Sequence, residues 1–278
     1  MSVLLFTVII LIGSYAAGLL GSLTGLGGGV IIIPLLTLLL NVDIHYAIGA
    51  SLVSVIATSS GSAAAYVREG ITNMRLGMFL EIATTCGALC GAILAIYTPT
   101  HFIAVIFGVI LIFSSIISLR KKAENITNKK SPLAEKLKLN GSYPSNDTVV
   151  QYSIINVGGG FFMMIFAGVI SGLLGIGSGA LKVIAMDTVM KVPFKVSTTT
   201  SNFMIGVTAS ASAVVYLQRG YISPGLSMPV VIGVLLGALT GSKILVNSSS
   251  SRWLRWVFAI VVTFLASQMI YNGIKGEI

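Results

Sequence analysis

Two ionisable side chains, Lys182 and Glu81, stand out because each interrupts a long apolar stretch. A charged group at membrane depth is costly, so it indicates a functional site. We expect Lys182 to face a negatively charged ligand, and Glu81 is a candidate for carrying a coupled proton. Ser51, Ser201 and Asn202 supply uncharged hydrogen-bond donors that suit a partly desolvated oxyanion.

Each of these residues also has a purely structural interpretation. Lys182 could extend toward an interface or cap a carbonyl, and Glu81 could pair with Arg75 or another basic group. Serine and threonine often only allow membrane helices to approach closely. Tyr66 and Tyr216 lie at the ends of apolar segments, where anchoring at the membrane interface explains them better than ligand contact.

Two glycine-rich stretches, 18–34 and 168–182, must position these side chains. A glycine cluster inside an apolar run favours a break in the helix, which is tolerated at membrane depth only inside protein or beside a wet cavity. Backbone amides can approach a ligand there without a Cβ in the way. The candidate ligand-binding residues of the two breaks are Gly25, Gly27, Gly28 and Gly29, and Gly175, Gly177, Ser178 and Gly179.

The second stretch is a copy of the first at an offset of 150 residues. Residues 17–91 align without a gap with residues 167–241, and 21 of the 75 positions are identical. Apolar composition alone would match leucine and valine, whereas the identities include glycines, serines and a tyrosine in register. The pattern indicates an internal duplication.

The composition, 55% hydrophobic and 9% charged, is typical of a polytopic membrane protein. We expect an all-α fold with two inverted-topology repeats, 1–119 and 151–278, joined by a basic cytoplasmic linker, 120–150. Each repeat begins with a broken or re-entrant helix pair, as a hairpin or as two crossings, followed by three transmembrane helices. The expected helices are 2–24, 28–40, 46–66, 76–95 and 102–119, then 152–176, 178–190, 196–217, 225–246 and 254–272.

The distribution of basic residues predicts the orientation. The linker contains seven of the 17 Lys and Arg residues and is therefore expected inside. An inverted second repeat also places Lys191, Lys195, Arg252 and Arg255 inside, whereas a parallel repeat would place all four outside. Both termini are then outside the cytoplasm. The net charge of +9 is explained by these loops beside anionic membrane lipid rather than by a nucleic-acid partner.

Other classes of protein find little support in the sequence. Two cysteines and two histidines provide no metal set. An intramembrane enzyme would need paired acids, and only Glu81 and Asp187 lie in the apolar segments without a clear partner. We expect no cofactor, no metal and no enzymatic activity.

Inverted repeats with helices broken at matching positions are typical of secondary transporters. The N-termini of the two half-helices, 28–40 and 178–190, would meet near the midplane and offer amides and positive dipole ends to an anion. We therefore expect a secondary transporter of small anions. A passive anion channel is the main alternative, and an intramembrane enzyme or a scaffold explains less. A homodimer is the default assembly.

Both copies resemble the sulfite exporter TauE/SafE family. The resemblance lies in Gly18-Leu-Leu-Gly-Ser-Leu-Thr-Gly-Leu-Gly-Gly-Gly, in Ala47-Ile-Gly-Ala-Ser51 and in Thr199-Thr-Ser201-Asn202. It implies transport of sulfite, sulfonates or related organic anions across a prokaryotic inner membrane. Ala50 stands where the family usually has threonine, and Ser178 replaces the middle glycine of the second copy.

Overall fold

The computed structural model describes residues 3–24, 28–68, 70–119, 131–145, 148–247 and 251–276. Its first half contains α1 (Val3–Thr24), α2 (Gly29–Pro34) with a π-helical turn η1 (Leu35–Leu39), α3 (Ile44–Arg68), α4 (Met74–Tyr97) and α5 (Thr100–Leu119). A short helix α6 (Pro132–Lys136) and a hairpin of β1 (Gly141–Ser145) and β2 (Thr148–Tyr152) follow. The second half contains α7 (Val157–Leu174), α8 (Gly179–Ile184) with η2 (Ala185–Val189), α9 (Phe194–Gln218), α10 (Pro224–Asn247) and α11 (Ser251–Lys275).

The expected all-α polytopic membrane fold is confirmed. Six helices of the described chain are long and apolar enough to cross a bilayer: α1, α3, α4, α7, α9 and α10. Many large apolar side chains point outward, such as Leu4 and Phe162, as expected for a surface solvated by lipid. The two remaining expected spans, 102–119 and 254–272, form α5 and α11, which pack against each other.

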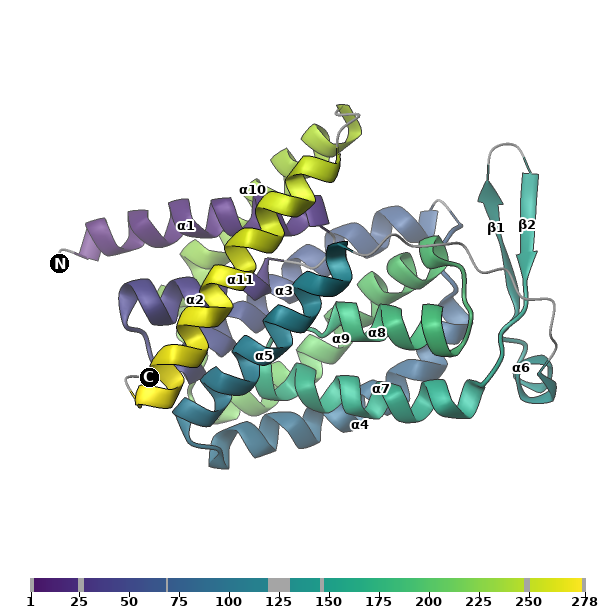
Figure 1. The fold of residues 1–278 in the computed structure, drawn as a ribbon, viewed down its shortest axis with the longest axis horizontal. Helices are drawn as coiled ribbons and strands as arrows, with labels where there is room; N and C mark the ends of the chain where they lie inside the picture. The colour runs from purple at the N-terminus through teal and green to yellow at the C-terminus, as the bar shows by residue number, and fades with distance from the viewer. Residues whose placement is uncertain are drawn as a thin grey trace.

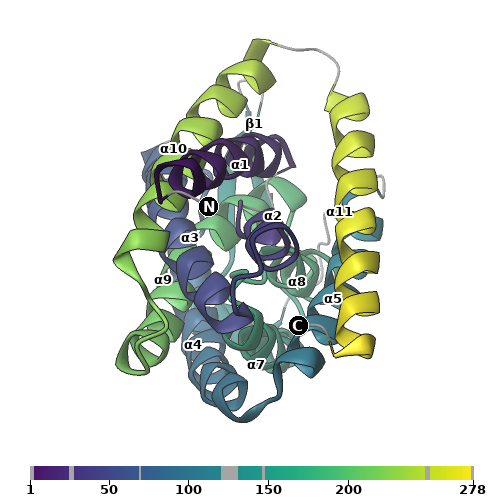
Figure 2. The same cartoon turned by 90° about the vertical axis from the view of Figure 1, so that its left-hand side faces the viewer.

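Long helices surround the two half-helices. Helix α1 packs along α10, α4 along α7 and α3 against α9. Viewed along the bundle, α2 and α8 lie near its middle (Figure 2). The two half-helices are thus shielded by longer helices, and irregular backbone is tolerated in a membrane protein where it is buried inside protein.

The duplication is visible in the packing of the backbone. A Cβ on Gly18 would lie 2.3 Å from the carbonyl oxygen of Val234, and a Cβ on Gly168 would lie 2.2 Å from that of Thr84. Gly168 and Val234 follow Gly18 and Thr84 by 150 residues, so each repeat makes the same contact with the other. Only glycine permits these close helix crossings.

Helices α1 and α7, which occupy matching positions in the two repeats, run in opposite directions, whereas the inversion of the whole repeats stays a prediction. Helix α1 starts at the N-terminal mark on the left and runs right, whereas α7 starts beside the hairpin on the right and runs left (Figure 1). The orientation of each repeat across a bilayer stays a prediction.

The segment between the repeats is a small folded unit rather than only a polar linker. Tyr143, Tyr152 and Ile154 are buried in a cluster that also contains Leu76 and Met190. The helix expected from residue 152 begins at Val157, because β2 continues to Tyr152. The cap of α7 is Asn156, whose side chain accepts a hydrogen bond from the Gly159 amide.

Asn73 fastens this unit to the membrane helices. Its side-chain oxygen accepts from the Leu76 amide and caps α4, and its side-chain nitrogen donates to the Leu139 carbonyl oxygen at 2.8 Å and to the Tyr152 hydroxyl at 2.9 Å. The Asn73 amide donates to Thr200 of α9. One residue therefore connects the folded unit with two membrane helices.

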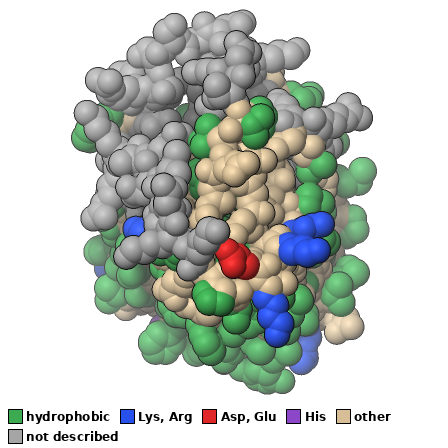
Figure 3. Space-filling view, turned by 90° about the vertical axis from the view of Figure 1, so that its right-hand side faces the viewer, with side chains coloured by type: hydrophobic (Ala, Val, Ile, Leu, Met, Phe, Trp, Pro, Cys, Tyr) green, Lys and Arg blue, Asp and Glu red, His purple; other side chains and the backbone are tan. Residues whose placement is uncertain are grey.

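Basic residues gather on the face that carries this unit. Lys136 and Lys138 are exposed on it, and Arg75 lies two residues after Asn73. The 190–195 turn, which contains Lys191 and Lys195, is connected to the same unit, because the Ile155 amide donates a hydrogen bond to the Met190 carbonyl oxygen. Basic side chains are visible on this face in Figure 3. That this face is the cytoplasmic one stays a prediction, and the side chains of Arg252 and Arg255 lie outside the described residues.

Candidate functional site

Lys182 is fully buried, although it carries an ammonium group. It lies on α8, and its Nζ donates a hydrogen bond to the Thr208 hydroxyl of α9. Thr208 Oγ1 lies 2.6 Å from Glu81 Oε1 and 2.9 Å from the Met204 carbonyl oxygen, and both are acceptors for its single hydrogen. The Thr208 hydroxyl therefore connects the two charged groups.

Glu81 on α4 is 7% exposed. Its Oε1 accepts from Thr208 and, at 3.1 Å, from Thr85, whereas its buried Oε2 has no hydrogen-bond partner among the described residues. The basic group beside Glu81 is thus Lys182, reached through Thr208, rather than Arg75, which is exposed at the start of α4. We name Lys182, Thr208 and Glu81 the charged triad.

An open groove of about 390 Å³ leads to one end of the triad. Glu81 and Thr85 form its polar part. Apolar side chains of α4 and α9 form the rest, and Met78, Ile82 and Val207 among them are exposed. The groove therefore connects the lipid-facing surface with Glu81.

Ser51 of α3 connects the breaks of the two repeats. Ser51 Oγ donates to the Gly175 carbonyl oxygen at 2.9 Å, which joins α3 to the break of the other repeat. A Cβ on Gly29 would lie 2.6 Å from Ser51 Oγ. Ser201 Oγ donates to the Gly179 carbonyl oxygen at 3.2 Å. Both serines expected at the site thus lie at the breaks, and both hydroxyls donate their hydrogen bond to a glycine carbonyl oxygen.

The second break depends on left-handed backbone. Gly175 and Gly177 have φ angles of +66° and +70°, which glycine adopts without strain. Ser178 also has a positive φ, 43°, and its buried hydroxyl donates to the Ala167 carbonyl oxygen at 2.6 Å. In the first break Gly28 is buried with an ordinary φ of −69°, and Gly25 and Gly27 lie outside the described residues.

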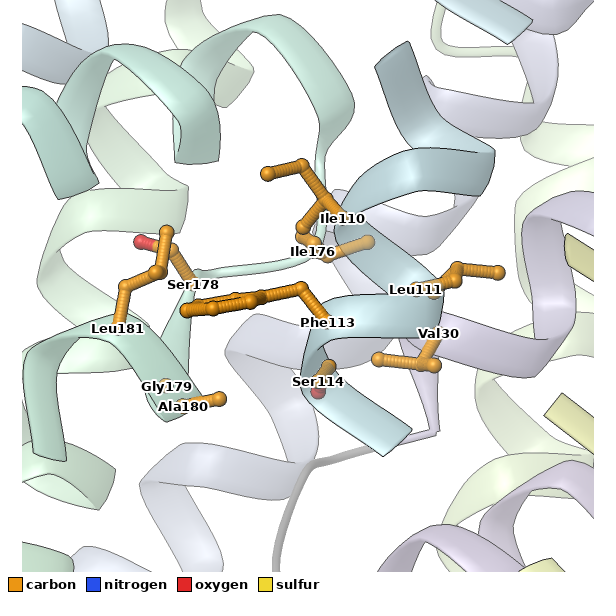
Figure 4. Close-up of a pocket in the computed structure, with 10 residues that line it drawn as sticks. All are labelled: Val30, Ile110, Leu111, Phe113, Ser114, Ile176, Ser178, Gly179, Ala180 and Leu181. Atoms are coloured by element: carbon orange, nitrogen blue, oxygen red, sulfur yellow. The ribbon is translucent and has the colours of Figure 1, made fainter. Parts of the chain in front are cut away.

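The tip of α8 borders a cavity of about 20 Å³, which is room for roughly one water molecule. Ser178 and Gly179 line it from the tip, and Phe113 and Ser114 of α5 line it from the other side (Figure 4). An anion of several heavy atoms does not fit there unless these elements move apart. This cavity at the described residues of the α8 tip therefore has no room for such an anion in this conformation.

Comparison with known proteins identifies the family of this chain. The family description "Sulfite exporter TauE/SafE" matches residues 9–269, nearly the whole chain. This chain belongs to the sulfite exporter TauE/SafE family. Among its relatives is the "Probable membrane transporter protein YunE" of Bacillus subtilis (strain 168), 28% identical over 97% of this chain and 98% of that protein.

Two other relatives of this TauE/SafE protein carry similar names. The "Probable membrane transporter protein YdhB" of Bacillus subtilis (strain 168) is 28% identical over 84% of this chain and 89% of its own. A "Probable membrane transporter protein" of Xylella fastidiosa (strain 9a5c) is 25% identical over 96% of both chains. No solved structure matches significantly. The TauE/SafE protein is thus a multi-pass membrane transporter.

One expectation for this TauE/SafE protein was wrong. Tyr216 does not anchor at an interface: it is fully buried, and its hydroxyl hydrogen is shared between the carbonyl oxygens of Gly172 (3.3 Å) and Leu173 (3.4 Å) at the end of α7. A break leaves helix carbonyls without partners, and Tyr216 supplies one. The Tyr66 side chain lies outside the described residues, and Asn202 is half-buried beside Ser201.

Thr208 is the member of the triad that the sequence did not single out. It is one of the identical positions of the duplication, paired with Thr58, but Ser201, Ser210 and Ser212 are identical to their counterparts as well, so this signal alone does not single out Thr208. Within the described ranges, no group of three or more His, Cys, Asp or Glu could hold a metal ion.

Proposed function

We propose that this TauE/SafE protein is a secondary transporter that carries small anions, such as sulfite or sulfonates, across the cytoplasmic membrane. The observation that carries the proposal is the complete burial of Lys182. A lysine in the interior of a membrane protein is expensive to maintain and marks a pathway for charge.

The half-helix tips supply the other proposed donors. Amides at the start of α2 and α8 carry the positive ends of the helix dipoles, and Gly179 has no Cβ to keep an anion away. Ser51 and Ser201 hold the tips in shape through their bonds to Gly175 and Gly179. Asn202, which is half-buried on α9 beside Ser201, is available as a further hydrogen-bond donor.

The small size of the cavity at the α8 tip supports a transporter rather than an open channel. A channel needs a continuous passage, whereas the space at the α8 tip holds about one water molecule. Alternating access, in which one repeat moves against the other, opens such a site to one side at a time. Phe113 of α5 borders the tip, so α5 is the element that we expect to move (Figure 4).

The basic face is the proposed cytoplasmic side. The folded unit with Lys136 and Lys138 lies there, together with Arg75, Lys191 and Lys195. Both chain ends lie at the opposite end of the bundle (Figure 1). The positive-inside rule then places both termini outside the cytoplasm.

A thermal-shift screen of the purified protein against sulfite, sulfate, thiosulfate, methanesulfonate, sulfoacetate and simple carboxylates tests the proposal. A ligand that binds the native state raises the melting temperature by mass action. We expect at least one anion to do so for the wild type and for Lys195→Met, which removes an exposed lysine, and none for Lys182→Met. An equal shift in Lys182→Met would remove Lys182 from the site, and no shift in the wild type would contradict anion binding.

A further inference from the structure

The charged triad joins a cation to a carboxylate that keeps one oxygen without a partner. Lys182 Nζ donates to Thr208, Thr208 lies 2.6 Å from Glu81 Oε1, and Glu81 Oε2 is buried with no hydrogen-bond partner among the described residues. Lys182 and Glu81 are also close enough to interact electrostatically. The oxygen without a partner is the place where a proton can be added without breaking a hydrogen bond.

We propose that the triad couples anion transport to a proton: Glu81 takes up one proton whenever a monovalent anion binds near Lys182. This inference rests on the proposed anion transport and adds its coupling ion. In this proposal Glu81 binds the proton, Lys182 contacts the anion, and Thr208 positions these two side chains.

The charge balance of the triad gives the reason. With Glu81 ionised and Lys182 protonated, the empty triad carries no net charge. A bound monovalent anion alone adds one negative charge to a low-dielectric interior, which is strongly unfavourable. A proton on Glu81 Oε2 removes that charge and leaves the Lys182 ammonium opposite the anion. Both the empty and the fully loaded forms are then neutral and able to change conformation at low cost.

The surroundings of Glu81 offer few competing charges. Helix α7, which packs along α4, contains no ionisable side chain. Helix α9 contributes Lys195, exposed at its start, and Tyr216, bonded to the second break. On α4 itself, Cys86 lines the same groove, Arg75 and Tyr97 lie near its ends, and Cys90 is exposed. Lys182 is thus the charged partner that faces Glu81.

The first test asks whether Glu81 takes up a proton and whether an anion promotes it. Dicyclohexylcarbodiimide is lipophilic and modifies protonated carboxyl groups, and the apolar groove gives it a path to Glu81. We expect labelling of Glu81, read by mass spectrometry, to fall as the pH rises and to increase when methanesulfonate is added at fixed pH. Labelling that is absent, or that is unchanged by methanesulfonate, would overturn the coupling. Exposed Glu135 is the internal control.

The second test uses proteoliposomes and radiolabelled methanesulfonate, a monovalent anion that takes up no proton near neutral pH. One proton per anion converts a pH difference of about one unit into about tenfold accumulation, insensitive to membrane potential. We expect Glu81→Gln to lose this tenfold accumulation, to become sensitive to membrane potential and to retain anion exchange. Glu135→Gln should behave as wild type.

The outcomes separate the two proposals. No uptake or exchange of any screened anion by the wild type would contradict the proposed function, while the labelling test still decides whether Glu81 binds a proton. Wild-type uptake with undiminished accumulation by Glu81→Gln would overturn the coupling alone. Thr208→Val should shift the pH dependence of uptake, and Thr208→Ser should restore it. Thr240→Val, which removes a threonine whose hydroxyl is bonded within its own helix, should leave the pH dependence of uptake unchanged.

Discussion

The C-terminal ends of the two half-helices share their backbone to the level of single hydrogen bonds, whereas the breaks before them differ, since Gly28 has a φ of −69° and Ser178 one of +43°. Each half-helix ends in a π-helical turn, η1 or η2, at the same place in its repeat. The Val42 amide then donates to the Leu36 carbonyl oxygen at 3.0 Å, and the Val192 amide donates to that of Met186 at 2.9 Å. The residues just before, Asn41 and Lys191, both have positive φ.

Their side chains differ in a way that matters for function. Where α8 carries Lys182, α2 carries Ile32, and both are fully buried. The counterpart of Glu81 is Val231, and Thr208 alone of the triad has an identical counterpart, Thr58. Both halves therefore share much of the scaffold, whereas of the two half-helices only α8 carries a buried lysine. Twofold packing does not require a twofold site.

The largest expected effect separates the two breaks. Lys182→Met should reduce anion uptake in proteoliposomes about a hundredfold, since a charged contact in a low-dielectric site is worth roughly 3 kcal/mol. Ile32→Met, at the matching position, keeps its volume and should leave uptake within a factor of about three. Equal losses would mean that position 182 serves packing, as position 32 does.

The next prediction concerns the shared scaffold. Gly18→Ala and Gly168→Ala should each lower the free energy of unfolding by roughly 3 kcal/mol, because the new Cβ meets the backbone of the facing helix. Gly158→Ala, on the same helix as Gly168 with nothing within 4 Å, should instead raise it by roughly 0.5 kcal/mol. Denaturant titration in detergent measures all three, and a loss confined to one repeat would contradict equivalent packing.

Asn73 tests a difference in how the repeats are connected, since its counterpart is Ser223. Asn73→Ala should lower the free energy of unfolding by roughly 2 kcal/mol, because it loses the α4 cap and the bonds to Leu139 and Tyr152. Asn73→Asp keeps the capping oxygen and loses only the donors. Both variants should speed hydrogen exchange in the 141–152 hairpin, while Asn73→Asp should keep more stability. Unchanged exchange would show that the hairpin is held by its apolar cluster alone.

The smallest effect concerns the turn before α3. Asp43 Oδ1 accepts from the amide and from Nδ1 of His45, and these bonds hold the pKa of the Asp43 carboxyl below its usual value of 3.8. The resulting stability is present above pH 3.8 and is lost as the pH falls through the lower folded-state value. Asp43 is half-exposed, so Asp43→Asn should cost only roughly 0.3 kcal/mol at neutral pH.

Melting temperatures of wild type and Asp43→Asn, measured across pH, check this. The difference should disappear at acidic pH. The second repeat has Pro193 and Lys195 at the corresponding positions, so its turn lacks this contact between a carboxyl group and an imidazole. A difference that persists at the lowest pH would show that Asp43 acts through something other than its charge.

The sequence was a good guide where the signal is local or repeated. The breaks at 28 and 178 and the helix that begins near residue 44 follow from glycine clusters, apolar length and the 150-residue offset. The hairpin at 141–152 was not expected, because its stability comes from residues such as Leu76 and Met190, far away in the chain. Tyr216 was misassigned for the same reason: its position suggested an interface, but packing of α9 against α7 buries it.

The amino-acid order alone determined the membrane class, the duplication and the positions of the glycine breaks, because these depend on composition and on neighbours within a few turns. Only the tertiary structure decided that Lys182 meets Glu81 through Thr208. That contact joins three helices, α8, α4 and α9, and depends on their relative rotation. Helix rotation is set by the sum of many side-chain contacts, so no single segment of the sequence reveals which polar groups will face each other.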